Sequence, residues 1–271
     1  NLTQNASVTV QNAPTEIIIN KTDKTTGAAM ANITFTLLDS AGNAVKLSKV
    51  ADGTYRPDSN GSTAIVTDAA GKAKVMYLPK GKYTLRETVP AGYAPQADAT
   101  INLTGKSTVT VKNEPLALAL TKVDSFTGKT LAGIAFTLLD SAGDAVKLTK
   151  QSDGVYHYDT DGTAGFTTGA DGKAVIYFIP AGNYTQRETA ETATGYAAAK
   201  DVPVTVTNSN GSDSPATVRF QNDPITLEFN KSDALTKEPL DGGLFQLKDA
   251  SGAVVKLKQI EAGSYRPNAD G

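Results

Sequence analysis

Short runs in which apolar and polar residues alternate dominate this chain. Residues 33–38 and 174–178 are examples, and both have Gly, Asp, Asn or Pro close to their ends. A period of two places alternate side chains on opposite faces of a strand, and no segment keeps a helical period over about eleven residues. About seven short strands in each stretch of about 100 residues predict an all-β fold of immunoglobulin-like antiparallel β-sandwiches arranged end to end.

The pattern recurs along the chain as an internal repeat. The aligned copies are residues 32–61, 133–162 and 242–271. Lys21 and its counterpart Lys122 lie 101 positions apart, whereas Lys122 and Lys231 lie 109 positions apart. The extra residues fall around positions 208–215, a polar, turn-like insertion of the kind that a surface hairpin tolerates.

Three segments indicate where the repeats begin and end. Each is a strand-like run that closes with Asn, an acidic or small residue, and Pro: residues 7–14, 107–115 and 216–224. The Pro marks the joint between repeats, with too few residues around it for a long flexible linker. The predicted domains are the last strand of a truncated repeat at 1–14, complete sandwiches at 15–114 and 115–223, and the first part of a further truncated repeat at 224–271.

Three polar residues of each complete repeat break the expected inside-outside alternation. Lys21 shares its strand face with Ile17 and Ile19, and Glu87 and Asn113 share theirs with the apolar or aromatic residues two and four positions earlier. All three side chains are therefore expected to point into the core. Their counterparts in the second repeat are Lys122, Glu188 and Asn222, while the incomplete flanking repeats supply only Asn12 and Lys231.

A lysine, a glutamate and an asparagine buried together form a reactive set. Desolvation lowers the pKa of a lysine and raises that of a glutamate, which favours the neutral amine and the protonated acid. A neutral amine is a nucleophile, and a protonated carboxylic acid polarises an amide carbonyl and shuttles protons. Attack on the Asn amide carbon expels ammonia and leaves an isopeptide bond. The alternative is a buried Lys–Glu salt bridge beside a hydrogen-bonding Asn, but such pairs stabilise proteins poorly.

These positions also carry a family resemblance. Each complete repeat has, in the same order, a Lys-x-Asp start, a Phe-x-Leu-x-Asp strand, a Tyr-x-x-x-Glu-Thr stretch and a closing Asn-x-Pro. They occupy residues 21–23, 35–39, 83–88 and 113–115 of the first repeat, and 122–124, 136–140, 184–189 and 222–224 of the second. This arrangement resembles CnaB-type domains, the prealbumin-like β-sandwiches of Gram-positive pilins and surface adhesin stalks.

The resemblance implies spontaneous isopeptide bonds between Lys and Asn, with Glu as the assisting acid. Carried over by position, the bonds are Lys21 to Asn113 aided by Glu87, and Lys122 to Asn222 aided by Glu188. Asn12 and Lys231 are cross-link positions without partners in this chain. The resemblance further implies an extracellular, cell-wall-anchored surface protein or pilus. The second repeat departs from the pattern, because Gln186 replaces Leu85 and Pro90 has no counterpart.

Other candidate sites are weaker. The sequence from Asp159 to Gly162 could suggest calcium, but it lacks the remaining ligands of a loop site and is read as a turn. His157, the single histidine, is expected on the surface with no ligand set around it. The Asp two residues after each Lys is expected to cap a turn at the strand end. No metal or cofactor is predicted.

Composition narrows the range of partners. The net charge is -2, with Lys and Arg interleaved among Asp and Glu, so no basic stripe for nucleic acid is expected. The absence of cysteine excludes disulfides and thiolate chemistry. No apolar run approaches the roughly 18 residues of a membrane span, so no membrane insertion is expected.

The sequence thus predicts a structural protein, a stalk of tandem sandwiches whose direct partners are neighbouring repeats of the same protein. The alternative is an adhesive module that binds a host matrix protein or glycan through sandwich loops, with residues 208–215 and 156–158 as the nearest candidates. A turnover enzyme has the least support, because the proposed reaction consumes its own residues once.

Overall fold

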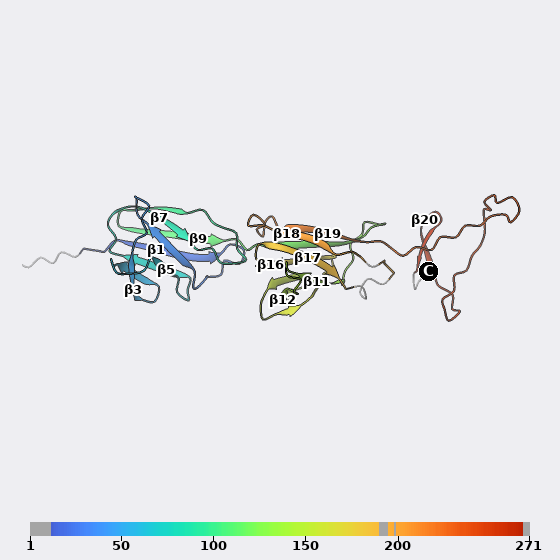
Figure 1. Ribbon diagram of the computed structural model, residues 1–271, viewed down its shortest axis with the longest axis horizontal. Helices are drawn as coiled ribbons and strands as arrows, with labels where there is room; N and C mark the ends of the chain where they lie inside the picture. The colour runs from blue at the N-terminus through green and yellow to red at the C-terminus, as the bar shows by residue number, and fades with distance from the viewer. Residues whose placement is uncertain (1–11, 190–194, 198, 268–271) are drawn as a thin grey trace, which may run out of the picture. The chain divides into compact units, whose positions relative to one another are not determined.

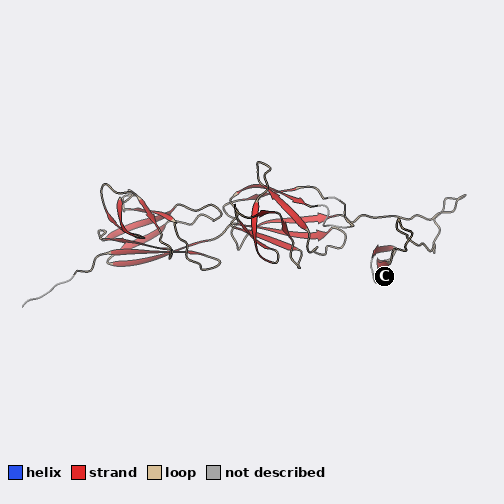
Figure 2. Ribbon diagram, turned by 90° about the horizontal axis from the view of Figure 1, so that it is seen from below, coloured by secondary structure: helices blue, strands red, loops and turns tan. Residues whose placement is uncertain are grey.

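The computed structural model describes residues 12–189, 195–197 and 199–267. They belong to two compact units, one extending to Ile225 and one beginning at Thr226. Strands are the regular elements of the described residues, which contain no helix (Figure 2) and hence none long and apolar enough to cross a membrane. The all-β fold class is confirmed.

The first sandwich consists of two sheets (Figure 1). One has the strand order β3 (Leu47–Ala51), β4 (Thr54–Pro57), β6 (Lys72–Met76), β1 (Glu16–Asp23) and β9 (Lys106–Asn113). The other has the order β5 (Ala64–Val66), β2 (Thr34–Leu38), β7 (Gly81–Glu87) and β8 (Ala99–Leu103).

The second sandwich repeats this arrangement. One sheet has the order β14 (Thr163–Ala164), β12 (Lys147–Ser152), β13 (Val155–Tyr158), β16 (Lys173–Tyr177), β10 (Ala117–Asp124) and β19 (Ala216–Asn222). The other has the order β15 (Phe166–Thr167), β11 (Ala135–Leu139), β17 (Gly182–Glu188) and β18 (Val202–Val206).

The sandwiches are not purely antiparallel, which corrects one detail of the sequence prediction. The first and last strands of each sandwich are parallel neighbours, as are β4 and β6 and their counterparts β13 and β16. The reason is the crossover before the last strand: β8 lies in the opposite sheet, so the chain returns to the first sheet and β9 runs beside β1 in the same direction.

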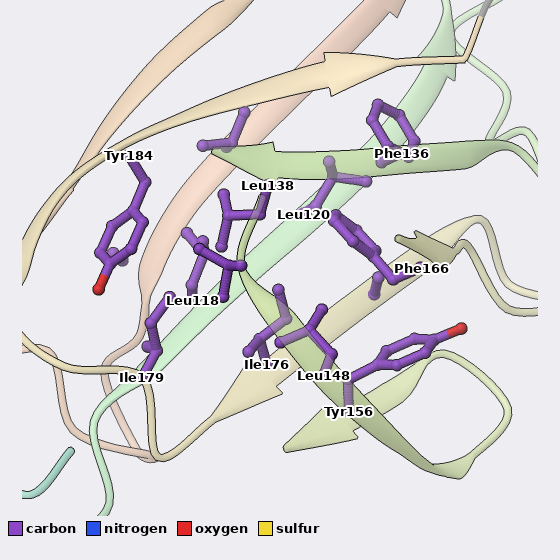
Figure 3. Packing of buried hydrophobic residues seen from close by; sticks show 14 of the residues in the cluster. Leu118, Leu120, Phe136, Leu138, Leu148, Tyr156, Phe166, Ile176, Ile179 and Tyr184 are labelled. Atoms are coloured by element: carbon purple, nitrogen blue, oxygen red, sulfur yellow. The ribbon is translucent and has the colours of Figure 1, made fainter. Parts of the chain in front are cut away.

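Each sandwich has its own apolar core. Ile17 and Ile19 of β1 are fully buried in the first sandwich. In the second, Leu120, Phe136 and Phe166 belong to one cluster, and the two phenylalanine rings stack with centroids 5.5 Å apart (Figure 3). Burying each such side chain contributes about 1.5–3 kcal/mol, so the core fixes which strand faces point inward.

The flanking segments differ from the two sandwiches. Residues 1–11, predicted to be a last strand, lie outside the described residues, and residues 12–14 are exposed and not in a strand. From Thr226 onward, the described residues form one hairpin, β20 (Leu257–Glu261) with β21 (Ser264–Pro267). Leu227 and Phe229 alternate in phase with Lys231, as apolar residues do with the lysines of the complete repeats, but both are exposed because no described strand covers them.

Candidate functional site

Strand register brings the predicted lysine and asparagine of each sandwich together. In the first sandwich Lys21 lies opposite Val111 and Asp23 lies opposite Asn113, so Lys21 and Asn113 are two register positions apart on neighbouring strands. Side chains two positions apart share a face. Glu87 reaches them from the opposite sheet, at the end of β7, where it pairs with Phe35. The three residues thus come from three strands and two sheets.

A close backbone contact holds β1 in place beside the site. The Lys21 N–H donates to the Gly71 carbonyl oxygen over 2.8 Å, and Gly71 has a φ of 68°. A Cβ atom at position 71 would lie 2.6 Å from the Lys21 carbonyl oxygen, so only glycine fits without a shift of the backbone. Gly172 provides the same contact for Lys122, with an N···O distance of 2.9 Å.

The site of the first sandwich is sealed from water. The side chains of Lys21 and Glu87 are 0% and 3% exposed, and Asn113 is fully buried. Asn113 Nδ2 donates to Glu87 Oε1 over 2.5 Å, and Lys21 Nζ lies 4.0 Å from the same oxygen. Asn113 Oδ1 and Glu87 Oε2 have no hydrogen-bond partner among the described residues. The inward orientation predicted from strand parity is confirmed for all three.

The second sandwich contains the same arrangement with different neighbours. Asn222 Nδ2 donates to Glu188 Oε1 over 2.7 Å, and Lys122 Nζ lies 3.6 Å from Glu188 Oε2. Lys122 Nζ has no hydrogen-bond acceptor in the described structure, although it lies 5.4 Å from the centroid of the Phe220 ring. In the first sandwich, by contrast, Lys21 Nζ contacts Met30 Sδ and the Thr22 carbonyl oxygen.

Burial favours the uncharged forms of these groups. Desolvation lowers the pKa of Lys21, against the charges of Glu87 and Asp23, which raise it. Desolvation likewise raises the pKa of Glu87, against the Asn113 hydrogen bond and the Lys21 charge. The pKa of Lys122 is also lowered, again chiefly by desolvation. A neutral amine and a protonated acid are the forms that attack on an amide requires.

The remaining predicted positions have structural roles or stand apart. Asp23 Oδ1 accepts hydrogen bonds from the Thr25 and Thr26 N–H groups, which is the predicted turn cap. Asp159 caps a turn through the Asp161 N–H, and the described residues hold no cluster that could bind a metal ion. Asn12 and Lys231 are exposed, so the described structure brings neither to a site.

His157 corrects the sequence prediction. It was expected on the surface, but it is half-buried, and its ring lies 4.6 Å from that of Phe178. Desolvation lowers its pKa. The packing of His157 on Phe178 is a contact between separate segments of the chain, so the local pattern around His157 did not predict it.

Sequence reasoning also missed a tyrosine beside each site. Tyr93 and Tyr196 follow the glutamate strands, and the Tyr196 hydroxyl donates to Asp124 Oδ2 over 2.8 Å. The signal was present as a Gly-Tyr pair at the same place in both repeats. It could not be interpreted before the path of the loop was known.

Comparison with known families identifies the fold. The sequence matches the SpaA family, described as a prealbumin-like fold domain, over residues 15–115 and 117–223. The chain belongs to this family. Its two SpaA domains correspond to the two β-sandwiches, and the resemblance noted in the sequence is confirmed. No curated protein matches the sequence.

A search of solved structures found several similar chains. The chain is similar to a streptococcal ancillary pilin, at 24% identity over 80% of this chain and 64% of that one, with a TM-score of 0.38. It is also similar to the shaft pilin SpaA of Lactobacillus rhamnosus GG, at 17% identity over 80% of this chain and all of that one, with a TM-score of 0.39. It is similar as well to the Bacillus anthracis TIE protein, at 20% identity over 79% of this chain and 34% of that one, with a TM-score of 0.37. The chain therefore spans less than two thirds of the TIE protein and of the ancillary pilin.

Proposed function

We propose that the two SpaA domains are load-bearing segments of an extracellular bacterial stalk, in a pilus or a surface adhesin. Each would be locked by one intramolecular isopeptide bond, between Lys21 and Asn113 in the first domain and between Lys122 and Asn222 in the second. The observation that carries the proposal is the burial, in both domains, of a Lys, a Glu and an Asn at one point between the first and last strands. The assignment to a surface stalk rests on the family resemblance.

The reaction begins with a proton transfer inside the core. Lys21 gives a proton to Glu87, which turns an ion pair into a neutral amine and a carboxylic acid. Removing both charges relieves the desolvation penalty of the buried pair. The 4.0 Å separation of Lys21 Nζ and Glu87 Oε1 requires only a small approach for this transfer.

The amine then attacks the asparagine amide. The Lys21 nitrogen bonds to Asn113 Cγ while Glu87 donates its proton to Oδ1, an atom without a partner in the described structure. This donation requires a prior rotation of the amide about Cβ–Cγ, which brings Oδ1 to the carboxyl group in place of Nδ2. Glu87 next carries a proton from the attacking nitrogen to Nδ2, and it takes back the proton on Oδ1 as the carbonyl group re-forms. The C–Nδ2 bond breaks, ammonia leaves, and Glu87 is regenerated.

Geometry supplies most of the acceleration expected for this step. The parallel β1–β9 ladder fixes the lysine and asparagine backbones side by side, which replaces a bimolecular encounter by an intramolecular one. Few contacts stabilise the charged form of either lysine. Lys122 Nζ lacks any hydrogen-bond acceptor among the described residues, and Lys21 Nζ has one backbone oxygen and one sulfur.

The bond would have a mechanical consequence. It joins the first strand of a domain to its last strand, so tension entering at β1 leaves through β9 without loading the strands between them. By analogy with a disulfide that closes a loop of about 90 residues, the cross-link adds on the order of 4–5 kcal/mol to the stability of each domain.

Intact-protein mass spectrometry tests the proposal. The folded chain is expected to be lighter than its sequence by two molecules of ammonia. Lys21→Ala and Lys122→Ala should each abolish the loss of one ammonia, and the double variant should have the full mass of its sequence. An unmodified mass in folded protein contradicts the proposal.

No observation on the described residues specifically supports the adhesive alternative. Within the 208–215 insertion, the Asp213 carboxylate accepts a hydrogen bond from Lys24 over 2.8 Å, and the Ser212 hydroxyl donates to Glu114. Tyr156, the other candidate, is 4% exposed. The Asp213 side chain is still 77% exposed, but neither segment presents an exposed cluster of aromatic residues.

A further inference from the structure

The loop after each glutamate strand returns to the residues that follow the reactive asparagine. Tyr93 forms an isolated β-bridge with Pro115. The Ala94 N–H donates to the Glu114 carbonyl oxygen over 2.9 Å, and the Leu116 N–H donates to the Gly92 carbonyl oxygen over 2.8 Å. This loop therefore fixes the chain immediately beyond Asn113.

The second domain repeats the contact. Tyr196 forms a bridge with Pro224, the Ala197 N–H donates to Asp223 over 2.8 Å, and the Ile225 N–H donates to Gly195 over 2.9 Å. The two loops differ in length and sequence before the Gly-Tyr pair. The shared feature is therefore the attachment of the Gly-Tyr pair beyond the asparagine.

The tyrosine hydroxyl reaches the aspartate that lies opposite the asparagine. Asp124 is the register partner of Asn222, and its Oδ2 accepts the Tyr196 hydroxyl over 2.8 Å. Its Oδ1 accepts the N–H groups of Phe126 and Thr127. The carboxylate is thus held from both sides, and it connects the end of β10 to the loop that follows β17.

The first domain shares the backbone attachment but not the hydroxyl contact. Asp23 is the register partner of Asn113 and is 4% exposed, yet its Oδ2 has no hydrogen-bond partner among the described residues. Burial raises the pKa of Tyr93 to about 12, with a smaller contribution from the charge of Asp23. The next backbone link is also present, because the Lys24 N–H donates to the Asn113 carbonyl oxygen over 2.7 Å.

We propose that Tyr196 is a positioning residue for isopeptide formation, an inference that rests on the proposed function. It ties together the end of the lysine strand, the exit from the glutamate strand and the end of the asparagine strand. Strand ends open most readily, and the reactive Asn is the last residue of its strand in both domains. Loss of the hydroxyl would let the asparagine move away from the amine, where small displacements cost large factors in rate.

The hydroxyl has a second effect, on the charge near the lysine. Glu188 of β17 and Asp124 of β10 are the charged groups that act on Lys122. The hydrogen bond from Tyr196 draws the Asp124 charge toward the loop. Without it, Asp124 acts more strongly on Lys122, holds the amine in its charged form to higher pH, and leaves less of the nucleophile.

The test compares matched tyrosine variants of the second domain. Tyr196→Phe removes the hydroxyl from the Asp124 contact. Tyr184→Phe is the control, because its hydroxyl also donates over 2.8 Å, but to the carbonyl oxygen of Pro180. The full chain is made by pulsed cell-free translation, and the loss of ammonia is followed by intact mass at a series of pH values.

Tyr196→Phe is expected to slow bond formation in the second domain about tenfold and to move its pH profile to higher pH, with the control unchanged. The unfolding free energies of both variants, measured on a chain that carries Lys122→Ala, separate this effect from a loss of stability. Equal rates and pH profiles in Tyr196→Phe and Tyr184→Phe overturn this inference alone. No ammonia loss in the unsubstituted chain overturns the proposed function as well.

Discussion

At the scale of single residues, each of the two domains buries three polar groups at positions where well-packed apolar side chains would stabilise the fold more. A buried ion pair gains little over a well-packed hydrophobic cluster, and an unpaired buried polar atom costs about 1–3 kcal/mol. Asn113 Oδ1, Glu87 Oε2 and Lys122 Nζ all lack partners among the described residues. The proposed cross-link would explain this cost, because it would convert the amine and the amide into one neutral bond.

Glu87→Gln is expected to block the cross-link in the first domain alone. Glutamine keeps the shape of the side chain but neither accepts nor returns a proton, so ammonia loss should fall from two equivalents to one. The first domain should also unfold at a lower denaturant concentration, by on the order of 4–5 kcal/mol in unfolding free energy. Intact mass and urea unfolding measure these effects. Full ammonia loss in this variant would show that the carboxyl group is not required.

Gln186→Leu is expected to stabilise the second domain by about 1–3 kcal/mol. Both polar atoms of the Gln186 amide are buried without a partner among the described residues, and the first domain has Leu85 at this position, only 2% exposed. Urea unfolding on a chain carrying Lys122→Ala gives the effect without the cross-link. The matched reverse change, Leu85→Gln on a Lys21→Ala chain, should destabilise the first domain. Destabilisation by Gln186→Leu would reveal a role for the buried amide.

At the scale of strands, alternation was sufficient to predict which residues point inward. The strand β1 alternates between half-buried and buried positions along its whole length, and Lys21 occupies a buried one. Glu87 likewise follows Tyr83 and Leu85 on the inner face of β7. The period of two is a local property of the backbone, so one sequence reveals it.

Strand pairing could not be predicted in the same way. The parallel pairing of β1 with β9 depends on a chain crossover between sheets, and no local pattern encodes it. The return of the Gly-Tyr loop to Asn113 and the packing of His157 on Phe178 are likewise contacts between distant segments. The reactive set was recognised because its residue types are chemically unusual in a core, not because their proximity was visible.

Gly71→Ala tests the close approach of the β6 turn to β1. The substitution places a side chain on a residue with a φ of 68° and brings its Cβ atom to 2.6 Å from the Lys21 carbonyl oxygen. Backbone strain alone lowers the free energy of unfolding by about 1–3 kcal/mol, and the steric overlap should add to this loss. Gly42→Ala is the control, because its φ is 84° and nothing lies within 4 Å of the added atom. Urea unfolding of both, on a chain carrying Lys21→Ala, should show the larger loss for Gly71→Ala. Equal losses would indicate that conformational strain alone matters.

At the scale of the whole molecule, both complete repeats form a two-sheet sandwich, whereas the described residues from Thr226 onward form only a hairpin. In this segment Lys231 is exposed, as are Leu227 and Phe229 on the preceding positions of the same alternation. Lys21 and Lys122 are buried in a sandwich, whereas Lys231 is not. The proposed reaction is therefore expected at Lys21 and Lys122 and not at Lys231.

Force spectroscopy tests the mechanical consequence. A chain pulled from its ends should show no extension that corresponds to unfolding of either SpaA domain, since each bond connects the first strand directly to the last. Lys21→Ala should add the extension expected from unfolding of the first domain, and Lys122→Ala that expected from unfolding of the second. Full extension of the unsubstituted chain would contradict the proposed path of tension.

Peptide mapping by tandem mass spectrometry tests the central claim most directly. After proteolysis of the folded, unsubstituted chain, we expect two branched peptides, one joining the segment around Lys21 to that around Asn113 and one joining the segments around Lys122 and Asn222. Each should have lost one ammonia. Recovery of the corresponding linear peptides alone, with unmodified lysine and asparagine, would contradict the account.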